Sequence, residues 1–181
     1  HLGGVFSNFI VDGVKEAELI KGAYNAEYGG RLSAVLNVIS REGNKNEFKG
    51  KANLSLLSAQ TTLEGPFYKG AWVLSGRRTY FDLVLPKVLP EGVASNIPPY
   101  YFYDIQSHVF SDITPKDRIS LSYYSGIDDI IFDTFGLDGR WGNNTISGHY
   151  RRVFNERLVG NFLLANSRFF TEFGLGGDYG L

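Results

Sequence analysis

The sequence predicts a mainly β protein built on an antiparallel sheet, and three observations predict it. Segments that alternate between apolar and polar residues recur along the chain and are separated by turn-forming residues. Glycine accounts for 22 of 181 residues, above the usual share of about 7%. Aromatic residues make up 15% of the chain, with 14 Phe and 11 Tyr. No stretch approaches 18 consecutive apolar residues, so no membrane-spanning helix is predicted, whereas barrel strands alternate and never build such a run.

Charge and cysteine content exclude several classes of protein. The net charge is −1 and the isoelectric point about 6.3, which argues against nucleic-acid binding because such proteins carry a basic stripe. The chain has no cysteine, which excludes disulfide frameworks, thiolate zinc sites and thiol catalysis. His1 stands where a start methionine would be, and we expect the chain to be an internal piece of a longer protein.

The first 46 residues mix short elements of different kinds. The pattern predicts a helical turn at 12–15 with Asp12 near its cap, a strand at 16–20, a glycine turn at 28–30, a strand at 34–39 and a polar linker at 41–46. We therefore expect residues 1–46 to form a unit separate from residues 47–181.

From residue 47 onward the sequence predicts about seven strands. They are expected at 51–57, 60–64, 71–83, 100–110, 118–127, 145–154 and 158–173. The clearest alternation lies in 118–127, where one face holds Ile119, Leu121 and Tyr123 and the other face holds Ser120, Ser122 and Tyr124.

The predicted turns alternate between short and long. Short turns are expected at Gly65-Pro66, 114–117 and 155–156, and long loops at 86–99 and 128–142. Short turns at one end and long loops at the other are typical of a transmembrane antiparallel β-barrel, and strands of about ten residues suit a tilted crossing of a bilayer. A soluble β-sandwich shows similar alternation and remains an alternative.

The segment from Lys21 to Gly43 resembles the end of the plug domain of TonB-dependent outer-membrane receptors. The likeness rests on Gly22 at the end of a strand, on the turn Tyr28-Gly29-Gly30-Arg31, and on a strand that closes on Ser40-Arg41-Glu42-Gly43. Downstream, 63–66, 75–80 and 101–104 look like the first barrel strands of the Bacteroidota-type members of that family. Ser33-Ala34 replaces the Gly-Gly of many members, which suits a subfamily.

The resemblance implies a fragment with two parts. Residues 1–46 would be the C-terminal part of an α/β plug domain, and residues 47–181 the N-terminal strands of the outer-membrane barrel. It further implies active uptake of a scarce nutrient, such as a siderophore or a glycan, across the bacterial outer membrane. The partners would be the inner-membrane TonB complex, through a segment absent from this chain, outer-membrane lipid and lipopolysaccharide, and a small nutrient ligand. Neither a cofactor nor a nucleic acid is expected.

The candidate site residues follow from these two parts. Arg31 and Arg41 are expected to pair with acids of the barrel wall such as Glu64. Ligand-binding candidates are Asn25 before the Tyr28 turn and the loop residues Trp141, Asn143 and Asn144. His108 and His149 lack a second ligand at metal spacing, and no catalytic motif is present, so neither a metal site nor an enzyme is predicted.

Two other functions remain open. One is a soluble β-sandwich module that binds carbohydrate, and the other is a small closed outer-membrane barrel. The receptor hypothesis places the face of Ile119, Leu121 and Tyr123 in lipid, whereas the sandwich hypothesis buries it against another sheet.

Overall fold

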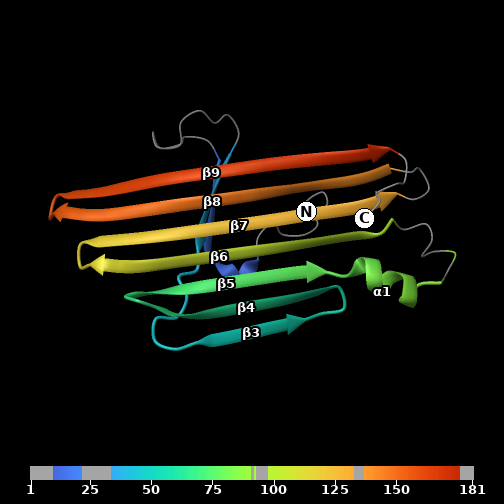
Figure 1. The fold of residues 1–181 in the computed structure, drawn as a ribbon, viewed down its shortest axis with the longest axis horizontal. Helices are drawn as coiled ribbons and strands as arrows, with labels where there is room; N and C mark the ends of the chain where they lie inside the picture. The colour runs from blue at the N-terminus through green and yellow to red at the C-terminus, as the bar shows by residue number, and fades with distance from the viewer. Residues whose placement is uncertain (1–9, 22–33, 91, 93–97, 133–136, 176–181) are drawn as a thin grey trace.

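A computed structural model describes residues 10–21, 34–90, 92, 98–132 and 137–175 of the chain. The fold is mainly β, as predicted, and contains two antiparallel sheets (Figure 1). The smaller sheet is a hairpin of β1 (Val14–Ile20) and β2 (Val35–Ser40), preceded by a 3-10 helix at Val11–Gly13. The larger sheet has seven strands that pair in simple chain order. Within the described residues its first and last strands do not pair with each other.

The strands of the larger sheet lengthen along the chain. They are β3 (Lys49–Leu54), β4 (Ser58–Phe67), β5 (Gly70–Thr79), β6 (Tyr100–Thr114), β7 (Asp117–Phe132), β8 (Leu137–Asn155) and β9 (Leu158–Leu175). One helix, α1 (Phe81–Val88), lies between β5 and β6. No helix in the described part of the chain is both long and apolar enough to cross a membrane.

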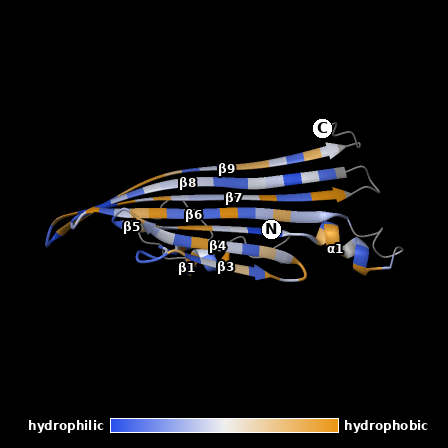
Figure 2. Ribbon diagram, turned by 60° about the horizontal axis from the view of Figure 1, so that its bottom comes forward, coloured by the Kyte–Doolittle hydropathy of each residue, from blue (hydrophilic) through white to orange (hydrophobic). Residues whose placement is uncertain are grey.

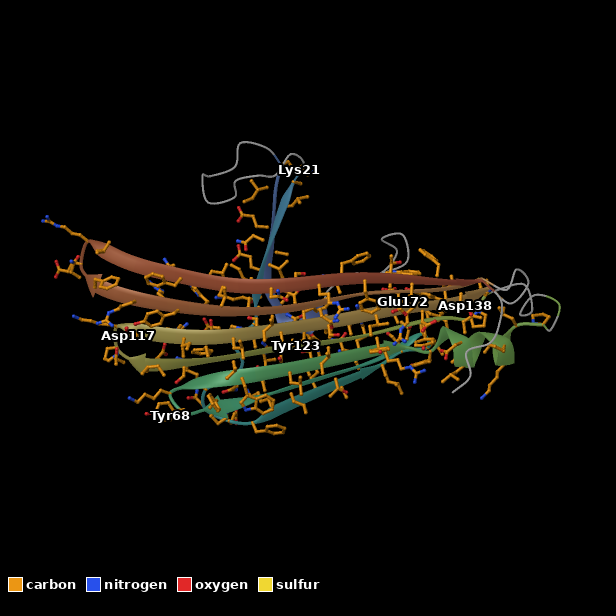
Figure 3. The ribbon with its side chains drawn as sticks, turned by 45° about the horizontal axis from the view of Figure 1, so that its top comes forward. Lys21, Tyr68, Asp117, Tyr123, Asp138 and Glu172 are labelled. Carbon is orange, nitrogen blue, oxygen red and sulfur yellow. The ribbon has the colours of Figure 1, made fainter. Side chains whose placement is uncertain are left out.

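The connections of the large sheet differ between its two ends. At one end β4–β5, β6–β7 and β8–β9 are joined by two residues each, at 68–69, 115–116 and 156–157. At the other end the connections at 55–57, 80–99 and 133–136 are longer. Tyr68 and Asp117 mark the first end in Figure 3, and Asp138 and Glu172 mark the second. The short turns predicted at 114–117 and 155–156 are confirmed at the first end. Of the two long loops predicted at the other end, only the connection that contains 86–99 is long.

The predicted turn at Gly65-Pro66 is wrong. Both residues lie in β4, and Pro66 pairs with Ala71. The turn follows at Tyr68, whose φ of 50° is left-handed. Phe67 and Gly70 close this two-residue turn, so Pro66 occupies a pair that exchanges no hydrogen bonds with β5. The backbone N–H at position 66 would point toward β3. The β3–β4 pairing stops at Glu64, so the proline removes no hydrogen bond from the sheet.

The predicted loop at 128–142 is also wrong. Asp128 pairs with Trp141 and Asp129 with Arg140, so β7 and β8 continue through this Asp- and Gly-rich stretch. Likewise, the strand predicted at 71–83 ends at Thr79, and the next residues form α1. Ladder hydrogen bonds to both neighbouring strands outweigh the local turn preference of Asp and Gly in β7 and β8.

The two faces of the large sheet have opposite polarity, and Figure 2 shows the sheet twisted and coloured by hydropathy. The register places the buried polar residues of one face together; they are Thr62, Glu64, Ser75, Thr79, Asp104, Gln106 and Asp128. We call this the polar face. The other, apolar face exposes Leu74, Tyr103, Ile105, Ile119, Leu121, Tyr123, Ile146, Phe162 and Leu164. Leu121 is 47% exposed and Leu164 82% exposed, so large apolar side chains are exposed on this face. The polar face buries its polar residues together with Ala71, Val73, Tyr100, Phe102, Phe110 and Ile130.

Two cross-strand charge pairs bracket an uncharged band on the apolar face of β7 and β8. Asp117 lies opposite Arg152, 3.6 Å between their charged atoms, and Asp129 lies opposite Arg140, 3.9 Å. Between them that face holds only uncharged residues: Ile119, Leu121, Tyr123, Ser125 and Ile127 on β7 and Gly142, Asn144, Ile146, Gly148 and Tyr150 on β8. The band therefore ends in charge on both sides.

An aromatic cluster fills the polar face at the end with the longer connections. Tyr100, Phe102 and Ile130 are buried there, and Phe81 of α1 and Trp141 of β8 pack against them. The ring centroids of Phe81 and Tyr100 lie 6.3 Å apart. This packing holds the first residue of α1 against β6, although a strand was predicted at 81–83 and a loop from 86.

We predict that Gly70→Ala destabilises the sheet strongly, whereas Gly148→Ala does not. A Cβ at Gly70 would lie 1.9 Å from the carbonyl oxygen of Phe110, whereas one at Gly148 meets nothing within 4 Å. Separating β5 from β6 breaks ladder bonds, and we expect a loss of about 2–4 kcal/mol in the free energy of unfolding. Urea titrations of protein folded in detergent micelles measure it. Equal stability of the two variants would contradict the strand spacing described here.

Candidate functional site

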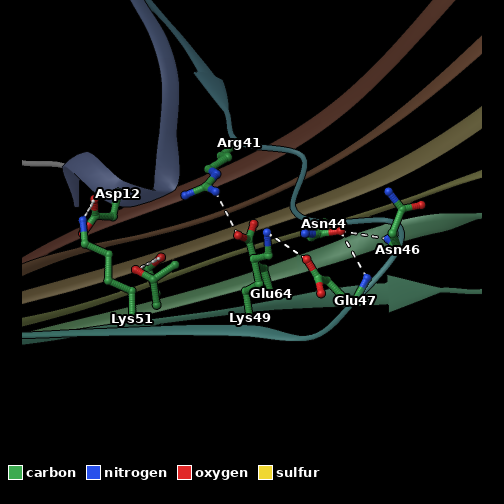
Figure 4. A network of polar contacts seen from close by, with 10 residues as sticks. Asp12, Arg41, Asn44, Asn46, Glu47, Lys49, Lys51 and Glu64 are labelled. Carbon is green, nitrogen blue, oxygen red and sulfur yellow. Dashed lines mark hydrogen bonds and ion pairs between the residues drawn. The ribbon is translucent and has the colours of Figure 1, made fainter.

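The segment before β3 is attached to the polar face through charged and amide side chains. Asp12, in the 3-10 helix, is the centre of the first attachment (Figure 4). Its carboxylate accepts hydrogen bonds from Lys51 Nζ at 2.8 Å, Asn53 Nδ2 at 3.1 Å and Gln60 Nε2 at 2.7 Å. All three donors lie on the polar face of β3 and β4. One carboxylate therefore binds two strands at once.

Arg41 and Glu64 form the second attachment, and this is the contact that the sequence predicts between the two parts. Arg41, directly after β2, donates from Nη2 to Glu64 Oε1 at 2.9 Å. The Glu64 side chain is only 8% exposed, whereas that of Arg41 is 44% exposed. The other Glu64 oxygen, Oε2, is buried and accepts no hydrogen bond from the described residues. Arg41 thus compensates a carboxylate that is largely removed from water.

A third attachment lies at the end with the two-residue turns. Arg118 donates to Glu42 at 2.9 Å and to Asp112 at 2.6 Å, and Lys45 donates to Asp112 at 3.0 Å. Arg118 and Asp112 lie opposite each other on the polar face, next to the turn at 115–116. This attachment therefore joins the segment at 42–45 to both β6 and β7.

Backbone contacts bring the same segment close to the sheet. Gln106 Nε2 donates to the Gly13 carbonyl at 3.1 Å. Gly43 has a φ of 85°, and a Cβ at this position would lie 2.4 Å from the Trp72 carbonyl oxygen. Only glycine combines that backbone conformation with so close an approach.

The β1–β2 hairpin differs from the segment that follows it. In Figure 1 the hairpin crosses behind the large sheet, and its tip at Lys21 extends past β9 (Figure 3). Within its described residues Glu16, Glu18 and Leu19 are exposed. None of the hydrogen bonds or ion pairs described between side chains joins the hairpin to the large sheet. The attachments therefore concentrate in Asp12 and in the segment at 41–45.

Charged and hydroxyl pairs occupy the middle of the polar face. Arg77 forms an ion pair with Asp104, and its Nε donates to Asp104 Oδ1 at 3.3 Å. The hydroxyls of Thr62 and Ser75 lie 3.0 Å apart, and His108 Nδ1 lies 2.8 Å from Ser122 Oγ. These pairs satisfy polar groups where a soluble sandwich would carry its apolar core.

Apart from Arg41 and Glu64, the sequence-predicted site residues divide into two groups. Gly22, Asn25, Tyr28, Gly29, Gly30 and Arg31 lie outside the described residues. Trp141, Asn143 and Asn144 are strand residues of β8, not loop residues, because the β7–β8 ladder extends to Leu137. Trp141 and Asn143 lie on the polar face, but Asn144 lies on the apolar face opposite Ser125. Alternation within a strand separates neighbours that a loop would have kept together.

The Asp12 contacts were not predicted. Asp12 is 39 to 48 residues away in sequence from the side chains that it binds, and no local pattern joins them. The sequence signal that exists is the two-residue spacing of Lys49, Lys51 and Asn53, which puts a row of polar side chains on one face of β3.

Metal-binding chemistry has no candidate among the residues that the structure describes. No group of three His, Cys, Asp or Glu side chains is placed there to hold an ion. His108 lies beside Ser122, and His149 lies on the polar face opposite Ser120.

Comparison with known proteins identifies no relative. Neither the family models, nor the curated proteins, nor the solved structures contain a match to this chain.

We predict that Arg41→Gln loosens the segment after β2. The substitution leaves the buried Glu64 carboxylate uncompensated, which costs about 1–3 kcal/mol. Endoproteinase Lys-C, which cleaves after lysine, should then cut after Lys45 about tenfold faster than in the unaltered protein. Glu64→Gln in the same background should restore slow cleavage in part.

Glu47→Gln is the matched control for that experiment. Glu47 pairs with Lys49 at 3.0 Å, but both side chains are exposed, so the pair contributes little. Equal acceleration by Arg41→Gln and Glu47→Gln would show that the Arg41–Glu64 pair does not hold the segment.

Proposed function

We propose that this chain is part of the wall of an outer-membrane β-barrel together with part of an internal plug, and that it takes part in TonB-dependent uptake of a nutrient. The observation that carries the proposal is the inverted polarity of the seven-stranded sheet. Its polar face is buried along much of β4 to β7, and its apolar face is exposed along β6 to β9. A lipid-facing wall around a hydrated lumen has this distribution.

The spacing of the charged pairs on the apolar face supports a membrane crossing. Asp117 and Asp129 are twelve residues apart on β7, which is about 40 Å of extended strand. At a tilt of about 40° this length spans about 30 Å along the bilayer normal, which equals the thickness of the hydrocarbon core. The charges of Asp117, Arg152, Asp129 and Arg140 would then lie at the two interfaces.

The connections support an orientation within that membrane. The three two-residue turns correspond to the short periplasmic turns of outer-membrane barrels, and the longer connections with α1 correspond to extracellular loops. The polar face then encloses the lumen, and the aromatic cluster beneath α1 lies toward its outer mouth.

The segment that lies on the polar face supports the plug assignment. Asp12, Arg41, Glu42 and Lys45 contact the wall through hydrogen bonds and ion pairs rather than through an apolar interface. Contacts of this kind exchange for water at low net cost, which suits a plug that must rearrange for transport. Energy would come from the inner-membrane TonB complex, acting through a plug segment that this chain does not contain. Lipopolysaccharide and outer-membrane lipid would surround the apolar face.

The two alternative functions fit the described residues less well. A β-sandwich requires a second sheet over the apolar face. The only other sheet in the described residues is the β1–β2 hairpin, and it comes directly after the 3-10 helix whose Asp12 binds the polar face. A small closed barrel requires β3 to pair with β9, and these strands do not pair in the described part of the chain.

We predict that Leu121 contacts lipid and Ser122 does not. The chain lacks cysteine, so Leu121→Cys and Ser122→Cys each carry one labelling site without further changes. These neighbours point to opposite faces of β7. A fluorophore at position 121 should be quenched by brominated acyl chains in lipid vesicles, and one at position 122 should be quenched by iodide in water.

Either of two results would contradict the membrane wall. If position 121 is shielded from both quenchers, the apolar face packs against protein, as in a sandwich. If iodide quenches both positions equally, the sheet does not enter the bilayer. Heat-dependent migration on electrophoresis gels, which folded outer-membrane barrels show, provides an independent check of folding.

A further inference from the structure

The polar face carries one group of exposed aromatic side chains, and the group lies at the proposed outer mouth. Phe169 and Phe173 of β9 are 67% and 70% exposed. The register puts Asn143 opposite Phe169, Thr171 opposite Trp141 and Gly139 opposite Phe173. Trp141 therefore lies diagonally between the two phenylalanines on the same face. β9 is the edge strand of the described sheet, and side chains on both of its faces are exposed, including Leu163 on the polar face.

Gly139 allows these rings to come together. A Cβ at Gly139 would lie 3.2 Å from Ile130, 3.4 Å from Phe173 and 3.5 Å from Trp141. The three side chains therefore meet over the glycine. Trp141 and Ile130 also belong to the buried cluster beneath α1, so the exposed rings rest on a packed support. Rings that are fixed in this way lose little conformational entropy when a ligand stacks on them.

Hydrogen-bonding groups border the rings on one side. The Ser167 hydroxyl donates to Asn143 Oδ1 at 3.1 Å, and the Thr145 and Ser167 hydroxyls lie 3.0 Å apart. Because Ser167 has one proton and gives it to Asn143, Thr145 is the donor in the second contact. The amide nitrogen of Asn143 remains a donor beside the Phe169 ring.

The charge around the rings favours a neutral ligand. Among the described strand residues of the polar face at this end, Arg77 is the one cation, and it is paired with Asp104. Asp128, opposite Trp141, accepts a hydrogen bond from the Tyr100 hydroxyl at 2.6 Å. Arg140 and Glu172 lie on the opposite face of the sheet. The described residues therefore offer an anionic iron chelate no unpaired counter-charge on this face, whereas a neutral sugar needs flat apolar surfaces and hydroxyl or amide partners.

We propose that Trp141, Phe169 and Phe173 form a stacking platform for a neutral oligosaccharide, with Asn143 as a hydrogen-bond donor to its hydroxyls. The proposal rests on the proposed function, because it needs the polar face to line a lumen. Phe169 and Phe173 are four residues apart, about 14 Å along the strand. That length exceeds one six-membered sugar ring, so the platform fits a chain of sugars better than a monosaccharide.

Tryptophan fluorescence tests the platform directly. The chain has two tryptophans, and Trp72 lies on the apolar face, so Trp72→Phe leaves Trp141 as the single reporter. The purified protein in detergent micelles is titrated with maltoheptaose, cellohexaose, mannohexaose and xylohexaose, and with a ferric catecholate as the anionic comparison. We expect at least one neutral oligosaccharide to slow acrylamide quenching of Trp141 and the ferric catecholate to leave it unchanged.

Variants identify the side chains responsible. Phe169→Ala and Phe173→Leu should each weaken the binding of the oligosaccharide that protects Trp141 about tenfold, because each substitution removes one stacking ring. Phe173→Leu keeps an apolar side chain, which guards against a loss through misfolding. The control is Phe162→Ala, which removes a comparably exposed ring from the apolar face and should leave the affinity unchanged.

The outcomes separate this inference from the proposed function. If Leu121 lies in lipid but none of the four oligosaccharides protects Trp141, the platform assignment is wrong and the barrel wall stands. Protection by the ferric catecholate alone, or poor quenching of Trp141 before any ligand is added, also overturns the platform. If Leu121 does not contact lipid, the proposed function fails first.

Discussion

The opposite polarity of the two faces of one antiparallel sheet is the constraint on which the rest of the structure depends. Ladder hydrogen bonds satisfy the backbone of β4 to β8 on both sides, so the side chains alone decide which surroundings each face accepts. The polar face binds Asp12 and Arg41, whereas the apolar face exposes aliphatic and aromatic side chains. In the proposed barrel wall the first face would meet water and the second hydrocarbon.

The same constraint explains how the covering segment is attached. Because the wall offers it carboxylates, amides and guanidinium groups, attachment depends on a few ion pairs with defined geometry. Glu64 shows the cost of this arrangement, since its carboxylate is buried with one oxygen bound to Arg41 and the other bound to none of the described residues. Near α1 and along β9, where aromatic rings replace these groups, none of the described attachments of this segment is found, and the proposed ligand would bind there.

Strand existence could be predicted from the sequence, but strand ends could not. The alternation of 118–127 identifies β7 correctly, because the two-residue period is set by the strand itself. Its continuation through Asp128 and Asp129 depends on pairing with Trp141 and Arg140, which no local pattern contains. Pro66 likewise reads as a turn until the end of β3 is known. At the candidate site, the Arg41–Glu64 pair could be anticipated from the resemblance, whereas the Asp12 contacts and the Phe169–Phe173 group require the register of the whole sheet.

The two-residue turns have a consequence for how this protein can vary. One residue added at Tyr68-Lys69 would either replace the two-residue turn by another turn type or shift the pairing of β5 with β4 by one residue, which would put side chains of opposite faces beside each other. Insertions in the longer connections leave the register unchanged. Sequence variation is therefore free at one end of the sheet and nearly forbidden at the other. If the sheet is the proposed barrel wall, variants would differ in the loops that meet the ligand while the strands in the membrane stay the same.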